Sequence, residues 1–256
     1  MVNNLFKNKA DEIKNKSIDE YRNADLLDPT DLKAVYNVVP VNPTAGAGLT
    51  KNIMVLGDSI VANGNITKHL RDLFNTDVMD VNFIGTLNTY GDDVPNHEGR
   101  GGWTAWHYTH VGEYNDNVNA FWDGTKFNFS NYMETNNFDG IDVVVINLGI
   151  NDSLNDAYLA RLIDDYNIII NSIREYNSQC AIIINLPLLP ACYEVHNTIS
   201  SDTDFMKTRR LEVWIKLIKE YDLKQDNKIF VAPVGAMIDV ENDYPYEMIN
   251  LSSIHI

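Results

Sequence analysis

Cysteine is scarce in this chain, and no long hydrophobic run is present. The two cysteines, Cys180 and Cys192, are too few for a disulfide framework, and their positions beside an apolar run are typical of buried thiols. Apolar runs such as residues 143–146 and 181–184 are far shorter than the ~20 residues of a membrane-spanning helix. The first residues also carry no apolar signal-peptide core. We therefore expect cytoplasmic synthesis without signal-directed export, so that any role outside the cell requires another carrier.

Basic residues and ligand-binding motifs are also few. Twenty Lys and Arg residues oppose thirty-six Asp and Glu residues, which gives a formal net charge of −16 at pH 7. A field of this sign repels phosphate backbones and anionic lipids, so we expect neither nucleic acid nor a membrane as a partner. The sequence holds no phosphate-binding Gly-x-x-x-x-Gly-Lys motif and no calcium-loop spacing, and we predict no cofactor. His107, His110 and Glu113 fit one helical face but lack a His-Glu-x-x-His pattern, so we predict exposed histidines and no metal site.

The first fifty residues differ in composition from the rest. Residues 3–25 are rich in Asn, Lys, Asp and Glu, and their apolar residues are too sparse for a buried stripe. Proline and glycine punctuate residues 38–48, as in a linker. We predict an N-terminal arm and linker over residues 1–50 and one domain over residues 51–256. The arm is either a frayed terminus or a docking segment for a larger protein assembly.

Short apolar runs alternate with helical periodicity beyond residue 51. Such runs suit strands that are buried on both faces, as in a parallel sheet covered by helices. The runs lie at residues 53–56, 81–84, 143–146, 181–184 and 229–231, and helical spacing of apolar residues spans 154–176 and 205–221. This alternation predicts an α/β fold, a doubly wound parallel sheet of about five strands with helices on both faces.

Residues 113–140 interrupt this rhythm with a mixture of Asn, Asp, Gly and aromatic residues. A connection this long is usually functional or disordered, and disordered segments are poor in aromatic residues. Two interpretations remain open. The aromatic residues, with Trp103, Trp106, Phe121 and Trp122 among those nearby, form either an ordered lip beside a site or a satellite of the core.

The ends of the predicted strands carry the residues that suit catalysis, because ligands of such sheets bind beyond the carboxyl ends of the strands. Ser59 follows the first run in Gly57-Asp58-Ser59, where a nucleophile at the start of a helix benefits from free backbone donors. An N-cap serine is the alternative. Val61 stands where the nucleophile elbow of α/β-hydrolases requires glycine, so that motif is excluded.

Two further strand ends offer hydrogen-bond donors. Gly102 follows the second run within Gly-Gly-Trp-Thr, where glycines let backbone N–H groups approach a substrate closely. His97 and Glu98, which precede this stretch, are expected to line the entrance of the site. Asn151 follows the third run, and its side-chain amide is able to donate toward the same point. Three donors that converge beside one serine, from Ser59, Gly102 and Asn151, constitute an oxyanion hole.

These blocks, in this order and at these strand ends, resemble the SGNH (GDSL-type) hydrolase family. The resemblance runs from about residue 52 to the C-terminus, and residues 124–133 look like the carbohydrate-esterase subgroup found in bacteria and phages. It implies a flavodoxin-like sheet and ester hydrolysis through an acyl-serine, without metal or organic cofactor. By the same resemblance, Ser59 is the nucleophile, and Gly102 and Asn151 supply oxyanion donors beside the Ser59 N–H.

The chain departs from the family at its C-terminus. The family takes its base from an Asp-x-x-His block, often followed by proline and a final helix. Here His255 lies in the right region, but Ser252 occupies the aspartate position and no proline or helix follows. Either His255 is the catalytic base, or the true block is missing and the domain is truncated at its C-terminus.

The combined motifs predict a serine esterase that removes acyl groups, chiefly acetyl, from a glycan or a small ester. A non-enzymatic alternative remains, because the His block is incomplete and the N-terminal arm is polar. In that alternative the same fold serves as a structural or glycan-binding module of a phage particle or another assembly.

Overall fold

The structure is a computed structural model, and it describes residues 50–76, 80–88, 93–189, 203–222, 224 and 227–237. Apart from Thr50, the predicted N-terminal arm lies outside the described residues, as do Cys192 and His255. Cys180 is buried, as the sequence predicts, and burial raises the pKa of its thiol to about 11. Within the described ranges, no helix is both long and apolar enough to cross a membrane.

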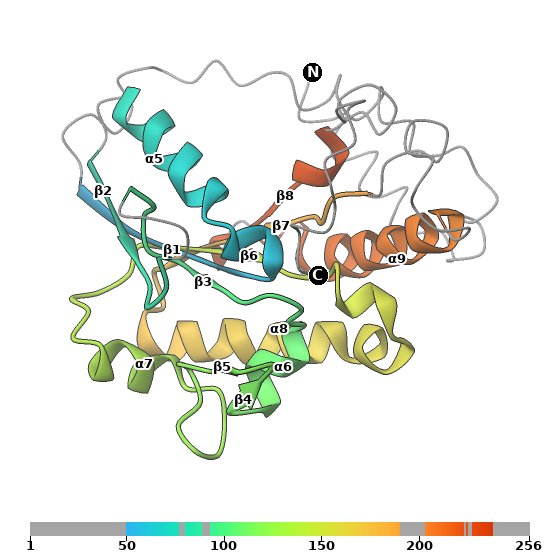
Figure 1. Ribbon diagram of the computed structural model, residues 1–256, viewed down its shortest axis with the longest axis horizontal. Coiled ribbons are helices and arrows are strands. Elements are labelled where there is room, and N and C mark those ends of the chain that lie inside the picture. The colour runs from blue at the N-terminus through green and yellow to red at the C-terminus, as the bar shows by residue number, and fades with distance from the viewer. Residues whose placement is uncertain are drawn as a thin grey trace.

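A parallel sheet forms the centre of the molecule (Figure 1). The sheet has six strands. Five of them follow one another in the order β2-β1-β6-β7-β8, and the sixth, the short β3, pairs with β1. The strands are β1 (Thr50–Gly57), β2 (Asp80–Ile84), β3 (Glu98–Gly99), β6 (Val143–Asn147), β7 (Ala181–Asn185) and β8 (Ile229–Ala232). The chain moves outward from β1 to one side and then, from β6 to β8, to the other side, which is the doubly wound, flavodoxin-like order. The predicted fold class is confirmed.

Helices cover both faces of this sheet (Figure 1). One face carries α5, and α6, α7 and α8 lie on the other. A two-stranded hairpin, β4 (Glu113–Tyr114) and β5 (Asn117–Val118), stands apart from the main sheet. Within the described ranges the helices are α4 (Ser59–Ala62), α5 (Asn65–Thr76), α6 (Ala105–His110), α7 (Phe129–Thr135), α8 (Asp156–Tyr176) and α9 (Thr203–Tyr221), with short 3-10 turns η1 (Asp152–Leu154) and η3 (Val234–Met237).

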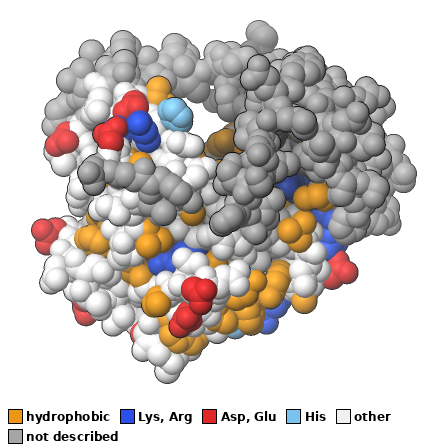
Figure 2. Space-filling view, viewed as in Figure 1, with side chains coloured by type: hydrophobic (Ala, Val, Ile, Leu, Met, Phe, Trp, Pro, Cys, Tyr) orange, Lys and Arg blue, Asp and Glu red, His pale blue; other side chains and the backbone are white. Residues whose placement is uncertain are grey.

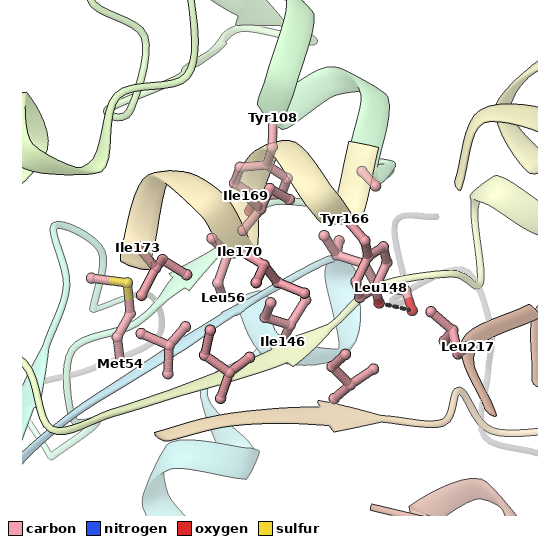
Figure 3. Packing of buried hydrophobic residues seen from close by; sticks show 14 of the residues in the cluster. Met54, Leu56, Tyr108, Ile146, Leu148, Tyr166, Ile169, Ile170, Ile173 and Leu217 are labelled. Atoms are coloured by element: carbon pink, nitrogen blue, oxygen red, sulfur yellow. Dashed lines mark hydrogen bonds between the residues drawn. The ribbon is translucent and has the colours of Figure 1, made fainter. Parts of the chain in front are cut away.

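Alternation along each strand divides the core into two layers, because successive side chains of a strand point to opposite faces. In β1, Met54 and Leu56 belong to the larger cluster, whereas Ile53 and Val55 belong to the smaller one. The smaller cluster packs under α5. The larger one fills the space between the sheet and α8, where Ile169, Ile170 and Ile173 meet the strands (Figure 3).

The aromatic residues of segment 113–140 belong largely to this larger cluster. Phe121, Phe127, Phe129 and Tyr132 are almost completely buried, and the ring of Phe121 stacks on that of Tyr132 with 4.2 Å between centroids. Trp103 is also fully buried. The interpretation of Phe121 and Trp103 as an aromatic lip is therefore wrong, since both rings serve the core.

The surface is mixed in charge and polarity. On the face drawn in Figure 2, the described Lys and Arg side chains lie in small separate groups among acidic and hydrophobic side chains, not in one basic patch.

Candidate active site

The register of the sheet brings three loops to one place. Gly57 at the end of β1 pairs with Gly99 of β3 on one edge and with Asn147 of β6 on the other. All three strands are parallel, so the chain leaves each of them in the same direction. The loops that carry Ser59, Gly102 and Asn151 therefore start side by side at the carboxyl edge of the sheet.

Glycine at the strand ends allows α4 to begin directly against the sheet. A Cβ atom on Gly57 would lie 2.4 Å from Val61 Cγ2 and 2.6 Å from Asn147 O, and one on Gly99 would lie 2.3 Å from Ala62 N. Neither position tolerates a side chain without displacement of the backbone or of Val61. This close approach fixes the first turn of α4, and with it Ser59, at the edge shared by the three strands.

Asp58 caps α4, and Ser59 does not. The Asp58 carboxylate accepts a hydrogen bond from Ile60 N at 3.0 Å, and Ser59 is the first helical residue. The N-cap interpretation of Ser59 is therefore wrong. Ser59 is half-buried, and among the described residues neither its hydroxyl nor its backbone N–H has a hydrogen-bond partner. Both groups are available to a bound molecule.

Gly102 lies in a tight turn that only glycine suits. Trp103 N donates to Arg100 O at 3.3 Å, which closes the turn, and Gly102 has a φ of +75°. A Cβ on Gly102 would meet only Asn115 Nδ2, at 3.6 Å, so backbone conformation and not crowding requires glycine there. Within the described part of the chain, the Gly102 N–H has no acceptor.

Asn151 is held against this turn. Its Nδ2 donates to Trp103 O at 2.9 Å, and the neighbouring Asp152 Oδ1 accepts from Ala105 N at 3.0 Å. A side-chain amide carries two N–H donors, so the bond to Trp103 leaves a second donor on Asn151. The structure thus holds Asn151 against the turn that contains Gly102, and so brings together two of the predicted site residues.

Two buried acidic residues, Asp58 and Asp152, are the sequence neighbours of Ser59 and Asn151. Burial raises the pKa of Asp58 to about 7, and the hydrogen bond from Ile60 N and the charge of Arg210 in α9 lower it in part. Burial also raises the pKa of Asp152 to about 7, and the charge of Asp58 adds to that effect. Sequence reasoning does not identify Arg210 as a neighbour of Asp58, because nothing in the pattern of a distant helix indicates which of its residues reaches the site.

His97 and His107 have structural roles. His97 is fully buried, and its Nδ1 accepts from Gly99 N at 3.1 Å, so the expectation that His97 and Glu98 line a site entrance is wrong. His107 is also buried: its ring completes the capping box of α6, and burial lowers its pKa to about 4. The prediction of an exposed His107 is therefore wrong as well. No group of three metal-binding side chains occurs among the residues that the structure describes.

The predicted base, His255, lies outside the described residues. Among the histidines that are described, none bonds to the Ser59 hydroxyl. The site as described therefore consists of a serine with an unengaged hydroxyl, two unengaged backbone donors and one side-chain donor, at the carboxyl edge of a doubly wound parallel sheet. Such an arrangement suits a hydrolase that uses a serine beside backbone and side-chain hydrogen-bond donors.

The chain belongs to the GDSL-like lipase/acylhydrolase family, whose model matches residues 55–255. The protein is therefore a hydrolase, as predicted. The match extends to the stretch that contains His255. No curated protein sequence matches the chain significantly.

Solved structures of low sequence identity resemble the chain. A family 3 carbohydrate esterase from Clostridium thermocellum is 20% identical, with a TM-score of 0.47 over 74% of this chain and 81% of that one. An acetyl esterase mutant with bound acetate ion is 19% identical, with a TM-score of 0.43 over 71% and 78%. A family 3 carbohydrate esterase from Talaromyces cellulolyticus is 20% identical, with a TM-score of 0.41 over 71% and 77%.

Proposed function

We propose that the protein is a serine esterase that removes acyl groups, acetyl in the first instance, from a glycan through an acyl-serine intermediate. The observation that carries the proposal is the arrangement of Ser59, Gly102 and Asn151. Their loops leave adjacent strands at one level, and the N–H groups of Ser59 and Gly102 have no acceptor among the described residues.

The proposed reaction has two halves. The Ser59 oxygen attacks the ester carbonyl carbon, and its proton passes to a base. The carbonyl oxygen becomes an oxyanion, which accepts hydrogen bonds from Ser59 N–H, Gly102 N–H and the second Nδ2 proton of Asn151. As the C–O bond to the leaving alcohol breaks, the base returns its proton to that alcohol. Water then attacks the acyl-serine by the same route and releases the acid and free Ser59.

His255 is proposed as the base. A neutral imidazole accepts the serine proton efficiently near neutral pH, and without such a base a serine hydroxyl is a weak nucleophile. Ser252 has no charge with which to orient the imidazolium, so we propose that another aspartate substitutes, with Asp239 and Asp243 the nearest aspartates in sequence. All four residues lie outside the described ranges.

The β4–β5 hairpin favours a sugar as the substrate. Asn115 Nδ2 would be the nearest atom to a side chain at Gly102, so the hairpin borders the Arg100–Trp103 turn, here called the oxyanion turn. Next to it, Tyr114 stacks on His107 with 3.8 Å between ring centroids and leaves 38% of its surface exposed. An exposed aromatic ring beside an amide suits the apolar face and hydroxyls of a sugar. The likeness of residues 124–133 to the carbohydrate-esterase subgroup points in the same direction.

The proposal is tested with a fluorophosphonate probe and with p-nitrophenyl acetate. The expected result is labelling of Ser59 and loss of both labelling and hydrolysis in Ser59→Ala. Ser130→Ala is the matched control, because Ser130 is also half-buried in the first turn of a helix, α7, and it should leave both signals intact. Labelling of another serine, with Ser59 unmodified, overturns the assignment. Absence of labelling in the folded wild type favours a non-catalytic module with the same fold.

A further inference from the structure

A buried ion pair lies beside the oxyanion turn and takes no part in the proposed chemistry. Arg100 Nη1 and Glu98 Oε2 are 2.7 Å apart, and their side chains are 2% and 0% exposed. Two charges removed from water cost more than a well-packed apolar pair of similar size in many proteins. Stability alone is therefore a poor explanation for this pair.

The polar atoms around the pair are satisfied by hydrogen bonds. Glu98 Oε1 accepts from Thr86 N at 2.6 Å, from Thr86 Oγ1 at 2.7 Å and from the Tyr132 hydroxyl at 2.8 Å. Arg100 Nε donates to Val118 O at 2.9 Å. Since Tyr132 belongs to α7 and Val118 to β5, the pair fixes Arg100 to elements outside the sheet.

Arg100 is also the first residue of the turn that presents Gly102. Its N–H donates to Gly57 O at 2.9 Å, and its carbonyl accepts from Trp103 N at 3.3 Å. The guanidinium carbon lies 5.2 Å from the centroid of the Trp103 ring, so the side chain of the first residue packs on the last residue of the turn. The main chain and the side chain of Arg100 thus restrain the same turn.

The same guanidinium connects the turn to the β4–β5 hairpin. Its hydrogen bond to Val118 O holds β5. The hairpin places Asn115 against Gly102, and its Tyr114 O accepts a hydrogen bond from Trp103 Nε1 at 3.2 Å. Loss of the Arg100 side chain therefore releases both the turn and the hairpin that borders it.

We propose that Glu98 and Arg100 are positioning residues for ester hydrolysis: their buried ion pair holds the Arg100–Trp103 turn so that the Gly102 N–H meets the oxyanion. This inference rests on the proposed function. Neither residue touches the substrate. A displacement of an oxyanion donor by about 1 Å lowers the rate by roughly a hundredfold, so a turn held loosely is catalytically costly even in a folded protein.

The test uses Arg100→Lys and Glu98→Gln in the full chain. Lysine keeps the charge toward Glu98 but loses the planar fork that also reaches Val118 O. Glutamine keeps the size and one acceptor oxygen of Glu98. We expect each variant to lower kcat on p-nitrophenyl acetate by roughly tenfold to a hundredfold with KM nearly unchanged. Asp165→Asn is the matched control, because Asp165 is also a fully buried acid with an arginine partner, Arg161 at 3.4 Å, and it should leave kcat unchanged.

Amide hydrogen exchange by NMR separates positioning from general destabilisation. In both variants the Trp103 amide, which closes the turn, should exchange faster, whereas the amides of β6 should keep their wild-type rates. If Trp103 and β6 accelerate together, or if kcat falls no more than in Asp165→Asn, the inference is overturned. Tyr132→Phe removes only one bond to Glu98 and provides the same comparison if the charge variants do not fold. If wild type shows neither hydrolysis nor Ser59 labelling, the proposed function fails, and the exchange rates still decide whether the pair holds the turn.

Discussion

Replacement of Asn151 by alanine separates the chemistry of this side chain from its contribution to folding. Among the described residues, the Asn151 amide donates one hydrogen bond, to Trp103 O at 2.9 Å, and the side chain is half-buried. Loss of such a bond lowers the free energy of unfolding by roughly 1 kcal/mol. Loss of one oxyanion donor lowers kcat by about 10²–10³, or about 3–4 kcal/mol of transition-state stabilisation. The catalytic effect should therefore exceed the stability effect by roughly 2 kcal/mol or more.

Asn177→Ala is the matched control for this substitution. Asn177 Nδ2 also donates to a backbone carbonyl, Ile141 O at 2.8 Å, and Asn177 is also half-buried, but it lies at the amino ends of the strands, away from the site. Urea unfolding followed by circular dichroism and steady-state kinetics on p-nitrophenyl acetate measure the two effects. Asn177→Ala should lose at least as much stability as Asn151→Ala, because Asn177 Oδ1 also accepts from Gln179 N at 2.9 Å, and only Asn151→Ala should lose kcat, with KM nearly unchanged. A wild-type kcat in folded Asn151→Ala would refute the role of this side chain as an oxyanion donor.

Three other predictions concern the same edge of the sheet. Gly102→Ala should lower the free energy of unfolding by about 1 kcal/mol, because φ is positive there, and should also lower kcat. A Cβ on Gly101 would meet no atom within 4 Å, so Gly101→Ala should change neither quantity. Urea unfolding and steady-state kinetics of the two variants check this. Because burial raises the pKa of Asp58 and of Asp152 from 3.8 to about 7, the folded state binds protons that the unfolded chain releases between about pH 4 and pH 7. Their contribution to the free energy of unfolding therefore falls as pH rises through this window, and Asp152→Asn should flatten that dependence in urea titrations at several pH values; an unchanged slope contradicts it. His255→Ala should lower ester hydrolysis by roughly 10²–10⁴, with partial recovery in added imidazole, and wild-type rates in this variant would exclude His255 as the base.

Strand positions can be predicted here because the central strands contribute side chains to both core clusters. Val144 and Ile146 of β6 and Ile182 and Ile184 of β7 belong to the larger cluster, while Val145 and Ile183 pack in the smaller one, so residues 143–146 and 181–184 appear in the sequence as apolar runs. The short strand Glu98–Gly99 has no such run. It is defined by its pairing with β1, and its buried Glu98 is satisfied by Thr86 and Tyr132 as well as by Arg100, so no local pattern indicates it.

The positions of Ser59, Gly102 and Asn151 at strand ends can also be predicted, because parallel strands end at one edge of the sheet. What the sequence does not show is which polar residues are paired inside. Asp58, not Ser59, caps α4 through Ile60 N, and Glu98 is buried in an ion pair instead of lining an entrance. The burial of Glu98 also depends on Thr86 and Tyr132, which only the folded chain brings close.

Aromatic residues near a site pose the same difficulty. Trp103 and Phe121 have the composition expected of a sugar-binding lip, yet both are fully buried, because aromatic rings fill cores as readily as they line surfaces. Tyr114, which sequence reasoning does not single out, is the aromatic residue that remains exposed next to the turn of Gly102. Exposure of a ring depends on the packing of elements that are distant in sequence.

The central claim is that Ser59 carries the acyl group during turnover. It is tested most directly by mixing the protein with an acetyl ester, quenching rapidly in acid and mapping acetylated peptides by mass spectrometry, with Asn177→Ala as a folded, active reference. We expect an acetyl group on Ser59 that forms within the first turnover and disappears when the substrate is exhausted. Turnover of the ester with Ser59 never acetylated, or with the acetyl group on another residue, would contradict it.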